Sequence, residues 1–227
     1  MGDVGILMLD NNIPRPLGDV GNAQTFDFPV AYRVVPGADT ALVVERAADG
    51  LLGGARAVAR QLVDAGARAI TTCCGFLAIV QRELADDTAV PVATSSLLQV
   101  PLVLQTLRRD QRLCVLTVNA ATLTEAHFHA VGVTAAHLDR VVVAGLEHTD
   151  HFFPAIMEKI DHLDPARAEA EVVAAARGVV ESDTAIGAFV FECTNLPPYA
   201  GAVRAATGRP VWDATSLIGW LHAGVSA

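Results

Sequence analysis

A repeat within the chain most limits what it can fold into. Residues 70–77 (ITTCCGFL) are similar to residues 189–196 (FVFECTNL), and their alignment places Cys74 on Cys193, 119 residues later. Further matches follow in the same order: 91–92 with 210–211, 95–97 with 215–217 after one inserted residue, and 5–11 with 113–119. A series of matches in one order is typical of a duplicated structural unit. We therefore predict two lobes related by a pseudo-two-fold axis.

Short apolar runs alternate with stretches of helical periodicity in both halves. The predicted strands are 4–9, 69–72, 90–93, 113–118, 141–144, 188–191 and 210–212. The predicted helices are 52–65, 76–85, 121–131, 167–180 and 199–206. Such alternation favours parallel sheets with helices on their faces. We therefore expect an α/β fold with two pseudo-symmetric lobes, each a mostly parallel sheet flanked by helices, with residues 1–98 and 210–227 in the first lobe and 99–209 in the second.

Segment 11–37 is rich in proline and interrupts this alternation. We predict a long ordered loop beside the first strand, a feature that is often functional. Residues 18–22 (GDVGN) within it are interpreted as a substrate-covering loop or as a plain cluster of turns. They lack the Lys-Ser/Thr ending of a phosphate loop, so nucleotide binding is not expected.

Composition excludes several classes of protein. The chain has 16 basic and 25 acidic side chains, a net charge of −9, and no basic run, so we expect no nucleic-acid partner. Although 52% of residues are hydrophobic, the uninterrupted apolar stretches are too short to span a membrane. The start, Met1-Gly2-Asp3, has no basic region typical of a secretory signal, and a cytoplasmic protein is expected. The four cysteines have no zinc-binding spacing, so no metal site is predicted.

Two cysteines, Cys74 and Cys193, occupy equivalent places where a predicted strand ends and a helix begins. Ligands bind at this edge of parallel α/β sheets. The helix dipole there is expected to lower the thiol pKa, giving one thiolate and one thiol at rest. Two thiols facing each other across a cleft between the lobes suit removal of a proton from a carbon next to a carboxylate. Nearby Thr72, Gly75, Thr194 and Asn195 could supply hydroxyl, amide and backbone N–H groups to that carboxylate.

Residues 70–77 and 192–200 (ECTNLPPYA) resemble the two cysteine motifs of the aspartate/glutamate racemase superfamily. The opening GILMLD at 5–10, with residues 15–16 and 18–22, resembles one branch of it. This resemblance implies an enzyme that needs no cofactor, with an active site between the lobes and Cys74 and Cys193 as catalytic residues. The decarboxylase branch keeps only the second cysteine, so a racemase or isomerase acting on an amino acid or related small acid is expected.

The resemblance also implies a set of substrate-binding residues, and a homodimer is a further expectation. The full predicted set is Asp10, Asn22, Thr72, Gly75, Ser95, Thr117, Asn119, Thr194 and Asn195. Decarboxylation or cis-trans isomerisation within the same superfamily remains an alternative, as does a non-catalytic protein that binds a small acid. A cysteine hydrolase is a further alternative, but it would leave the second cysteine unexplained.

Several neighbouring residues are given plainer interpretations. Adjacent strand residues point to opposite faces, so Cys73 is predicted to be a small buried residue rather than part of the cleft. Cys114 is predicted to be a core residue. Arg15 could bind a second substrate carboxylate, although a solvated arginine is the commoner case. His148 and His151 are interpreted as solvated, because no third ligand lies near them.

Overall fold

The computed structural model describes residues 2–158 and 162–226, which form two parallel sheets of the same strand order. The first sheet contains β1 (Val4–Met8), β2 (Val30–Val34), β3 (Ala69–Thr72) and β4 (Val92–Ala93) in the order β2-β1-β3-β4. The second contains β5 (Arg112–Thr117), β6 (Val141–Gly145), β7 (Ile186–Phe191) and β8 (Val211–Trp212) in the order β6-β5-β7-β8. Each strand of the first sheet thus has a counterpart in the second. The predicted α/β fold of two similar lobes is confirmed.

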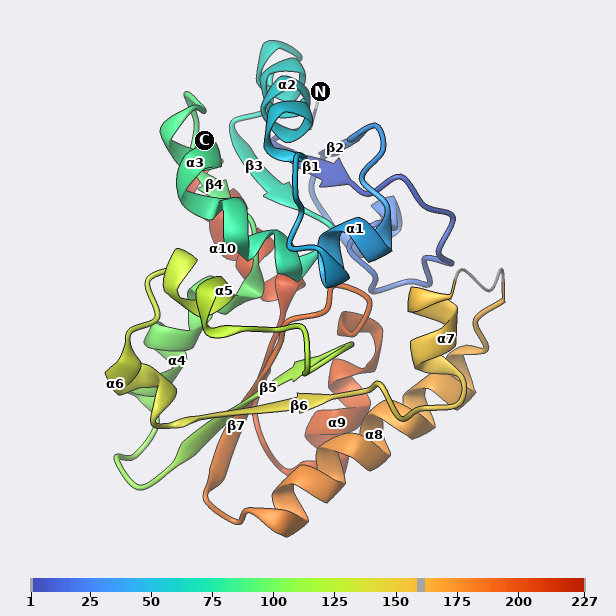
Figure 1. The fold of residues 1–227 in the computed structure, drawn as a ribbon, viewed down its shortest axis with the longest axis vertical. Helices are drawn as coiled ribbons and strands as arrows, with labels where there is room; N and C mark the ends of the chain where they lie inside the picture. Colours follow the sequence, from blue (N-terminus) through green and yellow to red (C-terminus); the bar gives the residue numbers. More distant parts are fainter. Residues whose placement is uncertain (1, 159–161, 227) are drawn as a thin grey trace.

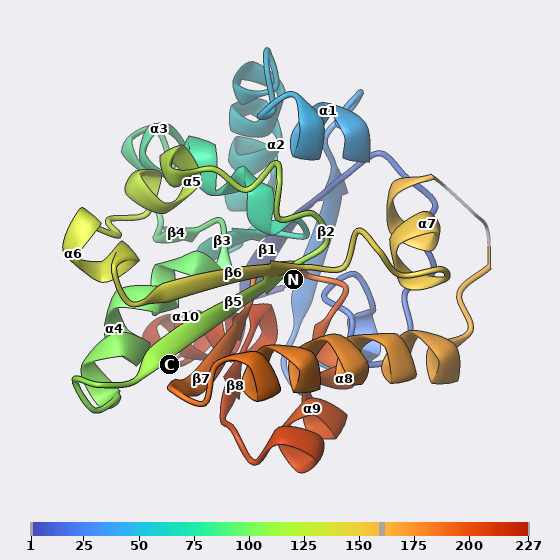
Figure 2. The ribbon, with the colours of Figure 1, turned by 60° about the horizontal axis from the view of Figure 1, so that its bottom comes forward.

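Helices flank both sheets (Figures 1 and 2). The α-helices are α1 (Thr40–Glu45), α2 (Leu52–Asp64), α3 (Gln81–Asp86), α4 (Val100–Thr106), α5 (Glu125–Ala130), α6 (Ala135–Leu138), α7 (Phe152–Met157), α8 (Pro165–Ser182), α9 (Ala200–Thr207) and α10 (Ala214–Val225). Short 3-10 helices are η1 (Ala23–Thr25), η2 (Gly75–Val80), η3 (Ser96–Gln99) and η4 (Pro197–Tyr199). The C-terminal α10 returns to pack on β1, β3 and β4, whereas α4 packs on β5. Helix α10 follows β8 of the second sheet and packs on the first, so it links the two sheets.

The central strands β3 and β7 place the two cysteine motifs. Every residue of β3 (AITT) and of β7 (IGAFVF) is buried. Strands of parallel sheets are covered on both faces, which explains their continuous apolar sequences. Because both strands are central in sheets of the same order, their carboxyl ends lie at equivalent places in the two lobes.

Other elements differ from the predictions. The segment expected to be a loop contains β2, which lies at the edge of its sheet and has no buried residue. An exposed edge strand does not need a continuous apolar sequence, so it was not predicted. The helix predicted at 76–85 is divided into η2 and α3. Thr215 and Ser216, which belong to the repeat match with 95–97, lie in the first turn of α10, where the Asp213 side chain accepts hydrogen bonds from both backbone N–H groups. The lobe boundaries remain a prediction; β8 bonds to β7, while α10 packs on the first sheet.

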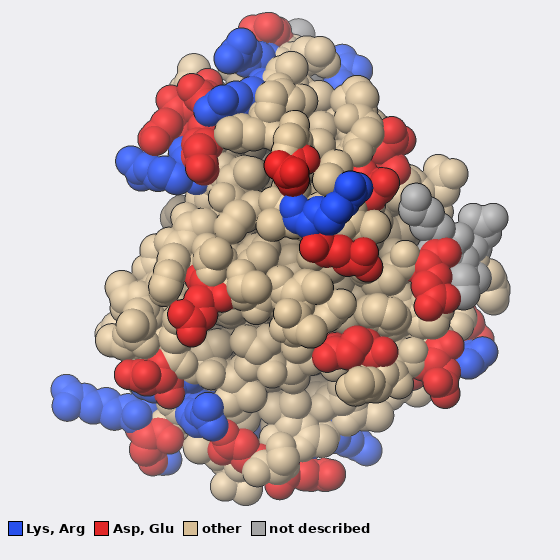
Figure 3. Space-filling model, in the orientation of Figure 1, with Lys and Arg blue, Asp and Glu red and all other residues tan. Residues whose placement is uncertain are grey.

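Charged side chains of both signs are interspersed on the face shown in Figure 3. Pairs such as Arg82–Asp86 and Arg112–Asp183 bring opposite charges together on the surface. Exposed pairs of this kind contribute little to stability. Within residues 2–158 and 162–226, no helix combines the length and apolar character needed to cross a membrane.

Candidate active site

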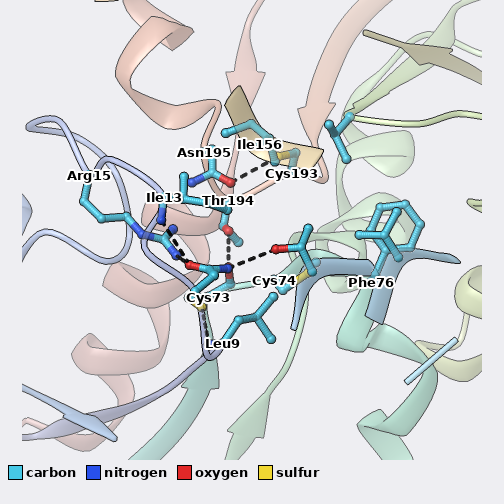
Figure 4. Close-up of a pocket in the computed structure, with 15 residues that line it drawn as sticks. Leu9, Ile13, Arg15, Cys73, Cys74, Phe76, Ile156, Cys193, Thr194 and Asn195 are labelled. Atoms are coloured by element: carbon cyan, nitrogen blue, oxygen red, sulfur yellow. Dashed lines mark hydrogen bonds between the residues drawn. The ribbon is translucent and has the colours of Figure 1, made fainter. Parts of the chain in front are cut away.

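A small cavity lies over the carboxyl ends of β3 and β7 (Figure 4). Its volume is about 20 Å³, close to the space that one water molecule requires. Its walls come from both lobes: Leu9, Asn11, Ile13, Arg15, Thr40, Val44, Cys73, Cys74, Gly75, Phe76, Val118, Ile156, Cys193, Thr194 and Asn195. The site is therefore narrow in this structure, and a substrate larger than a water molecule fits only if part of this wall moves.

Cys74 and Cys193 line this cavity from equivalent turns. The Leu77 N–H donates to the Cys74 carbonyl and the Leu196 N–H to the Cys193 carbonyl, both at 3.1 Å. The Cys193 Sγ lies 3.7 Å from Asn195 Oδ1. The repeat therefore places two thiols at one cavity, as two proton-transfer groups would require.

Burial controls the protonation of both thiols. It raises the pKa of Cys74 well above its ordinary value, and the nearby Glu192 adds to the rise. Burial and Glu192 also raise the pKa of Cys193, and the backbone of Asn195 partly opposes them. The charges of Asp19, which raises this pKa, and of Arg15, which lowers it, act against each other. The expectation of a lowered thiol pKa is wrong, because loss of hydration outweighs the N–H groups of two short 3-10 turns. Both groups are thiols at rest.

Arg15 is fixed beside the cavity by a buried carboxylate. Its Nη1 lies 3.2 Å from Oδ1 of Asp19, and its Nη2 donates to Asn11 Oδ1 at 3.2 Å. Asp19 is fully buried and also accepts hydrogen bonds from Gly21 N and Asn195 Nδ2, both at 2.7 Å. Burial raises the pKa of Asp19, and these donors with Arg15 oppose the rise. The solvated arginine interpretation is wrong; Arg15 is the cation in the wall.

Glu192 is a second buried acid at the site, and it follows the last residue of β7. The Thr117 hydroxyl donates to its Oε2 at 2.7 Å. Its other oxygen, Oε1, is buried and has no partner among the described residues. Burial raises the pKa of Glu192 to about 8. An acid directly after a wholly apolar strand is the sequence signal that could have identified it.

The predicted substrate-binding residues divide into two groups. Gly75, Thr194 and Asn195 line the cavity, while Asp10, Asn22, Thr72, Ser95, Thr117 and Asn119 do not. Thr72 Oγ1 donates to the carbonyls of Cys74 and Thr94, and Thr194 Oγ1 donates to the Cys73 carbonyl. These hydroxyls are therefore engaged in holding the loops together.

The remaining members of the predicted set have local roles. Ser95, Asn22 and Asn119 each accept a hydrogen bond from a backbone N–H two residues on, and exposed Asp10 accepts one from Gly37 N. Ser, Asn and Asp side chains, which suit a polar binding site, also cap turns and helix starts by accepting hydrogen bonds from nearby backbone N–H groups. Sequence spacing does not separate these two uses.

Cys73 is buried as predicted, but it also lines the cavity from which it was expected to be excluded. Its Sγ accepts a hydrogen bond of 3.1 Å from Leu9 N at the end of β1. The cavity covers the strand ends rather than one face of the sheet, so side chains from both faces border it. Cys114 is fully buried within β5 and lies outside the cavity wall, as predicted.

No protein-family model matches the chain. Solved structures of similar fold cover nearly all of it. A variant of arylmalonate decarboxylase has a TM-score of 0.61 at 16% identity, with 98% of this chain and 92% of that chain covered. An aspartate racemase homologue from Pyrococcus horikoshii OT3 has a TM-score of 0.59 at 16% identity, with full coverage of both chains. The fold is that of the aspartate/glutamate racemase superfamily, as predicted.

Sequence comparison is more specific. Dimethylsulfoniopropionate lyase from Durusdinium sp. clade D is 30% identical over 93% of this chain and 71% of its own length. Two such lyases from Emiliania huxleyi (strain CCMP1516), numbered 3 and 6, are each 34% identical over 92% of this chain. The chain spans only 56% of the length of each of those two relatives. The chain belongs to the dimethylsulfoniopropionate lyase family.

These relatives correct the predicted activity. The expectation of a racemase or isomerase acting on an amino acid is wrong, because the curated relatives at 28–34% identity are named as lyases. The physical reason is that a thiol pair can begin several reactions by removing a proton beside a carboxylate. The fate of the resulting carbanion depends on the substrate's leaving group, which neither cysteine motif nor fold specifies.

Proposed function

We propose that this chain cleaves dimethylsulfoniopropionate into dimethyl sulfide and acrylate. The observation that carries the proposal is the pair Cys74 and Cys193 at one narrow cavity, in a chain of the lyase family. The substrate has a carboxylate, an acidic C–H bond next to it, and a dimethylsulfonium leaving group on the following carbon. It is thus a small carboxylate-bearing molecule of the kind expected from the sequence.

The reaction is an elimination in which a thiolate is the base. The thiolate takes the proton from the carbon next to the carboxylate, and the C–H electron pair forms the double bond of acrylate. The bond from the next carbon to sulfur breaks, and its electron pair leaves with neutral dimethyl sulfide. One proton passes to the enzyme in each turnover and returns to solvent, so no oxidant or reductant is needed.

We assign the base to Cys193 rather than Cys74. The backbone of Asn195 and the charge of Arg15 lower the pKa of Cys193, although Asp19 offsets Arg15. The charged groups that act on Cys74, which are Glu192 and the other two thiols, all raise its pKa. A cation near a developing thiolate stabilises it most where water is excluded. Cys74 faces the same cavity and is placed to contact the substrate from the other lobe.

The cavity wall has separate polar and apolar parts. Arg15 and the backbone around Gly75 and Thr194 can receive the carboxylate, whose negative charge grows as the proton leaves. Phe76 and the aliphatic wall that includes Val118 can contact the sulfonium methyl groups, and an aromatic face attracts such a cation. This arrangement orients the C–H bond toward the thiols.

The test is to supply purified protein with dimethylsulfoniopropionate and measure headspace dimethyl sulfide together with acrylate. We expect equal amounts of the two products and no product from a Cys74→Ala/Cys193→Ala double variant. Folded wild-type protein that forms neither product contradicts the proposal. The homodimer expected from the resemblance stays a prediction, which sedimentation velocity of the purified chain would test.

A further inference from the structure

Glu192 distinguishes the two cysteine motifs, which are otherwise related by the repeat. It precedes Cys193 as Cys73 precedes Cys74, so a carboxyl group in one lobe occupies the place of a thiol in the other. Both side chains bond to the end of the neighbouring strand of their sheet, Cys73 to Leu9 N and Glu192 to the Thr117 hydroxyl. The symmetry of the fold is therefore broken by one acid beside the thiols.

The carboxyl of Glu192 is enclosed between the lobes. It is fully buried, and its Oε1 has no hydrogen-bond partner within the described part of the chain. A side chain at Gly75 would collide with this oxygen and with the Glu192 carbonyl, so the turn after Cys74 packs directly on the acid. A buried carboxylate with one bond from a neutral hydroxyl is poorly stabilised, which favours the protonated form.

The groups that face Glu192 do not include a positive charge. Cys74 lies just before η2, which packs against Glu192, and Cys193 is the next residue in the chain after Glu192. Strand β5 supplies the neutral hydroxyl of Thr117. Ser96 of η3 donates to the carbonyl of Phe191 rather than to the carboxyl. Arg15 acts on Cys193 and is paired with Asp19, and it is not among the influences on Glu192.

We propose that Glu192 is a positioning acid for the thiol pair: its carboxyl holds a proton in the state in which a thiolate forms, so the site carries one negative charge at a time. When Glu192 loses its proton, its charge opposes ionisation of Cys74 and Cys193 alike. Once the site has lost one proton, the charge is either on the Glu192 carboxylate or on a thiolate. These two forms hold the same number of protons, so the ratio of one to the other does not change with pH. The thiolate fraction therefore stops rising above about pH 8, where Glu192 titrates.

The proposal predicts how a neutral residue at position 192 changes the pH dependence of the thiolate fraction. Glu192→Gln keeps the size of the side chain and resembles the protonated acid. Below about pH 7 the variant and the wild type should form the same small fraction of thiolate. Above about pH 8 the wild-type fraction levels off, while that of the variant continues to rise about tenfold per pH unit until the thiol itself titrates.

The experiment measures the rate of alkylation of Cys74 and Cys193 by iodoacetamide between pH 6 and 10, resolved by peptide mass spectrometry. This readout does not require lyase turnover, so its failure is distinguishable from failure of the proposed function. We expect a plateau above about pH 8 in wild type and in Glu125→Gln, which removes an exposed acid of α5, and no plateau in Glu192→Gln. Parallel profiles in all three proteins, or slower alkylation of Glu192→Gln at every pH, would overturn the proposal.

A second measurement uses the wild type alone, in case Glu192→Gln does not fold. Infrared spectra of protein carrying isotope-labelled glutamate should contain a protonated carboxyl band at pH 6.5 that disappears as the pH passes about 8. The label separates Glu192 from buried Asp19. Absence of that band from folded protein at pH 6.5 would also overturn the proposal.

Discussion

Asn195 Nδ2 donates a 2.7 Å hydrogen bond to Oδ2 of Asp19, 176 residues away in the chain. This contact joins the Cys193 motif of one lobe to the proline-rich segment of the other. Because Asp19 also pairs with Arg15, the bond fixes the cation of the cavity relative to the thiol it influences. The site is thus assembled only when the lobes are in place.

Removing only Arg15 from the Arg15–Asp19 pair should destabilise the protein more than replacing both residues. Arg15→Met leaves a fully buried carboxylate without its cation, and we expect a loss of about 3–5 kcal/mol in the free energy of unfolding. Arg15→Met combined with Asp19→Asn should recover part of that loss. Urea denaturation measures both values, and equal destabilisation of the single and double variants would contradict the pairing.

Gly75 should not tolerate a side chain. Gly75→Ala places a methyl group against Oε1 and the carbonyl of Glu192, so the turn after Cys74 must move. We expect at least a tenfold loss of lyase rate with reduced thermal stability. Gly178→Ala in α8 is the control, because a methyl group there meets nothing within 4 Å and should stabilise the helix by about 0.5–1 kcal/mol.

Stability should fall as the pH rises through the titration of Glu192. Its pKa is about 8 when folded against an ordinary value of 4.5, so the folded state binds the extra proton between these values. Its contribution to the free energy of unfolding is therefore full below about pH 4.5 and lost as the pH rises to about 8, on the order of 5 kcal/mol at most. Denaturation midpoints across this range should be flatter for Glu192→Gln. A wild-type dependence unchanged by that substitution would contradict the prediction.

Cys73 should be structural, although it lines the cavity. Cys73→Ala removes the acceptor of the Leu9 N–H, and we expect a loss of about 1–3 kcal/mol in unfolding free energy. The lyase rate should remain within a few-fold of wild type once the variant is folded. A loss of rate as large as that of Cys193→Ala would instead place Cys73 in the reaction.

The sequence was most informative where structure depends on neighbours along the chain. The apolar runs of β3 and β7 predicted strands, and the repeat predicted that Cys74 and Cys193 occupy equivalent ends. It was least informative where a partner lies in the other lobe. Arg15 has an interpretable role only beside Asp19 and Asn195, and Thr117 is understood only through Glu192. The expectation of a racemase was wrong because the cysteine motifs do not specify a substrate's leaving group.

The most direct test of the account is the rate of dimethyl sulfide release from dimethylsulfoniopropionate by Cys193→Ala compared with Cys114→Ala. Both remove a buried thiol, but Cys193 lines the cavity and Cys114 lies within β5. We expect Cys193→Ala to lose a hundredfold or more, as removal of a general base typically does, while folded Cys114→Ala keeps most of its rate. Equal rates from the two variants would contradict a thiol-based elimination at this cavity.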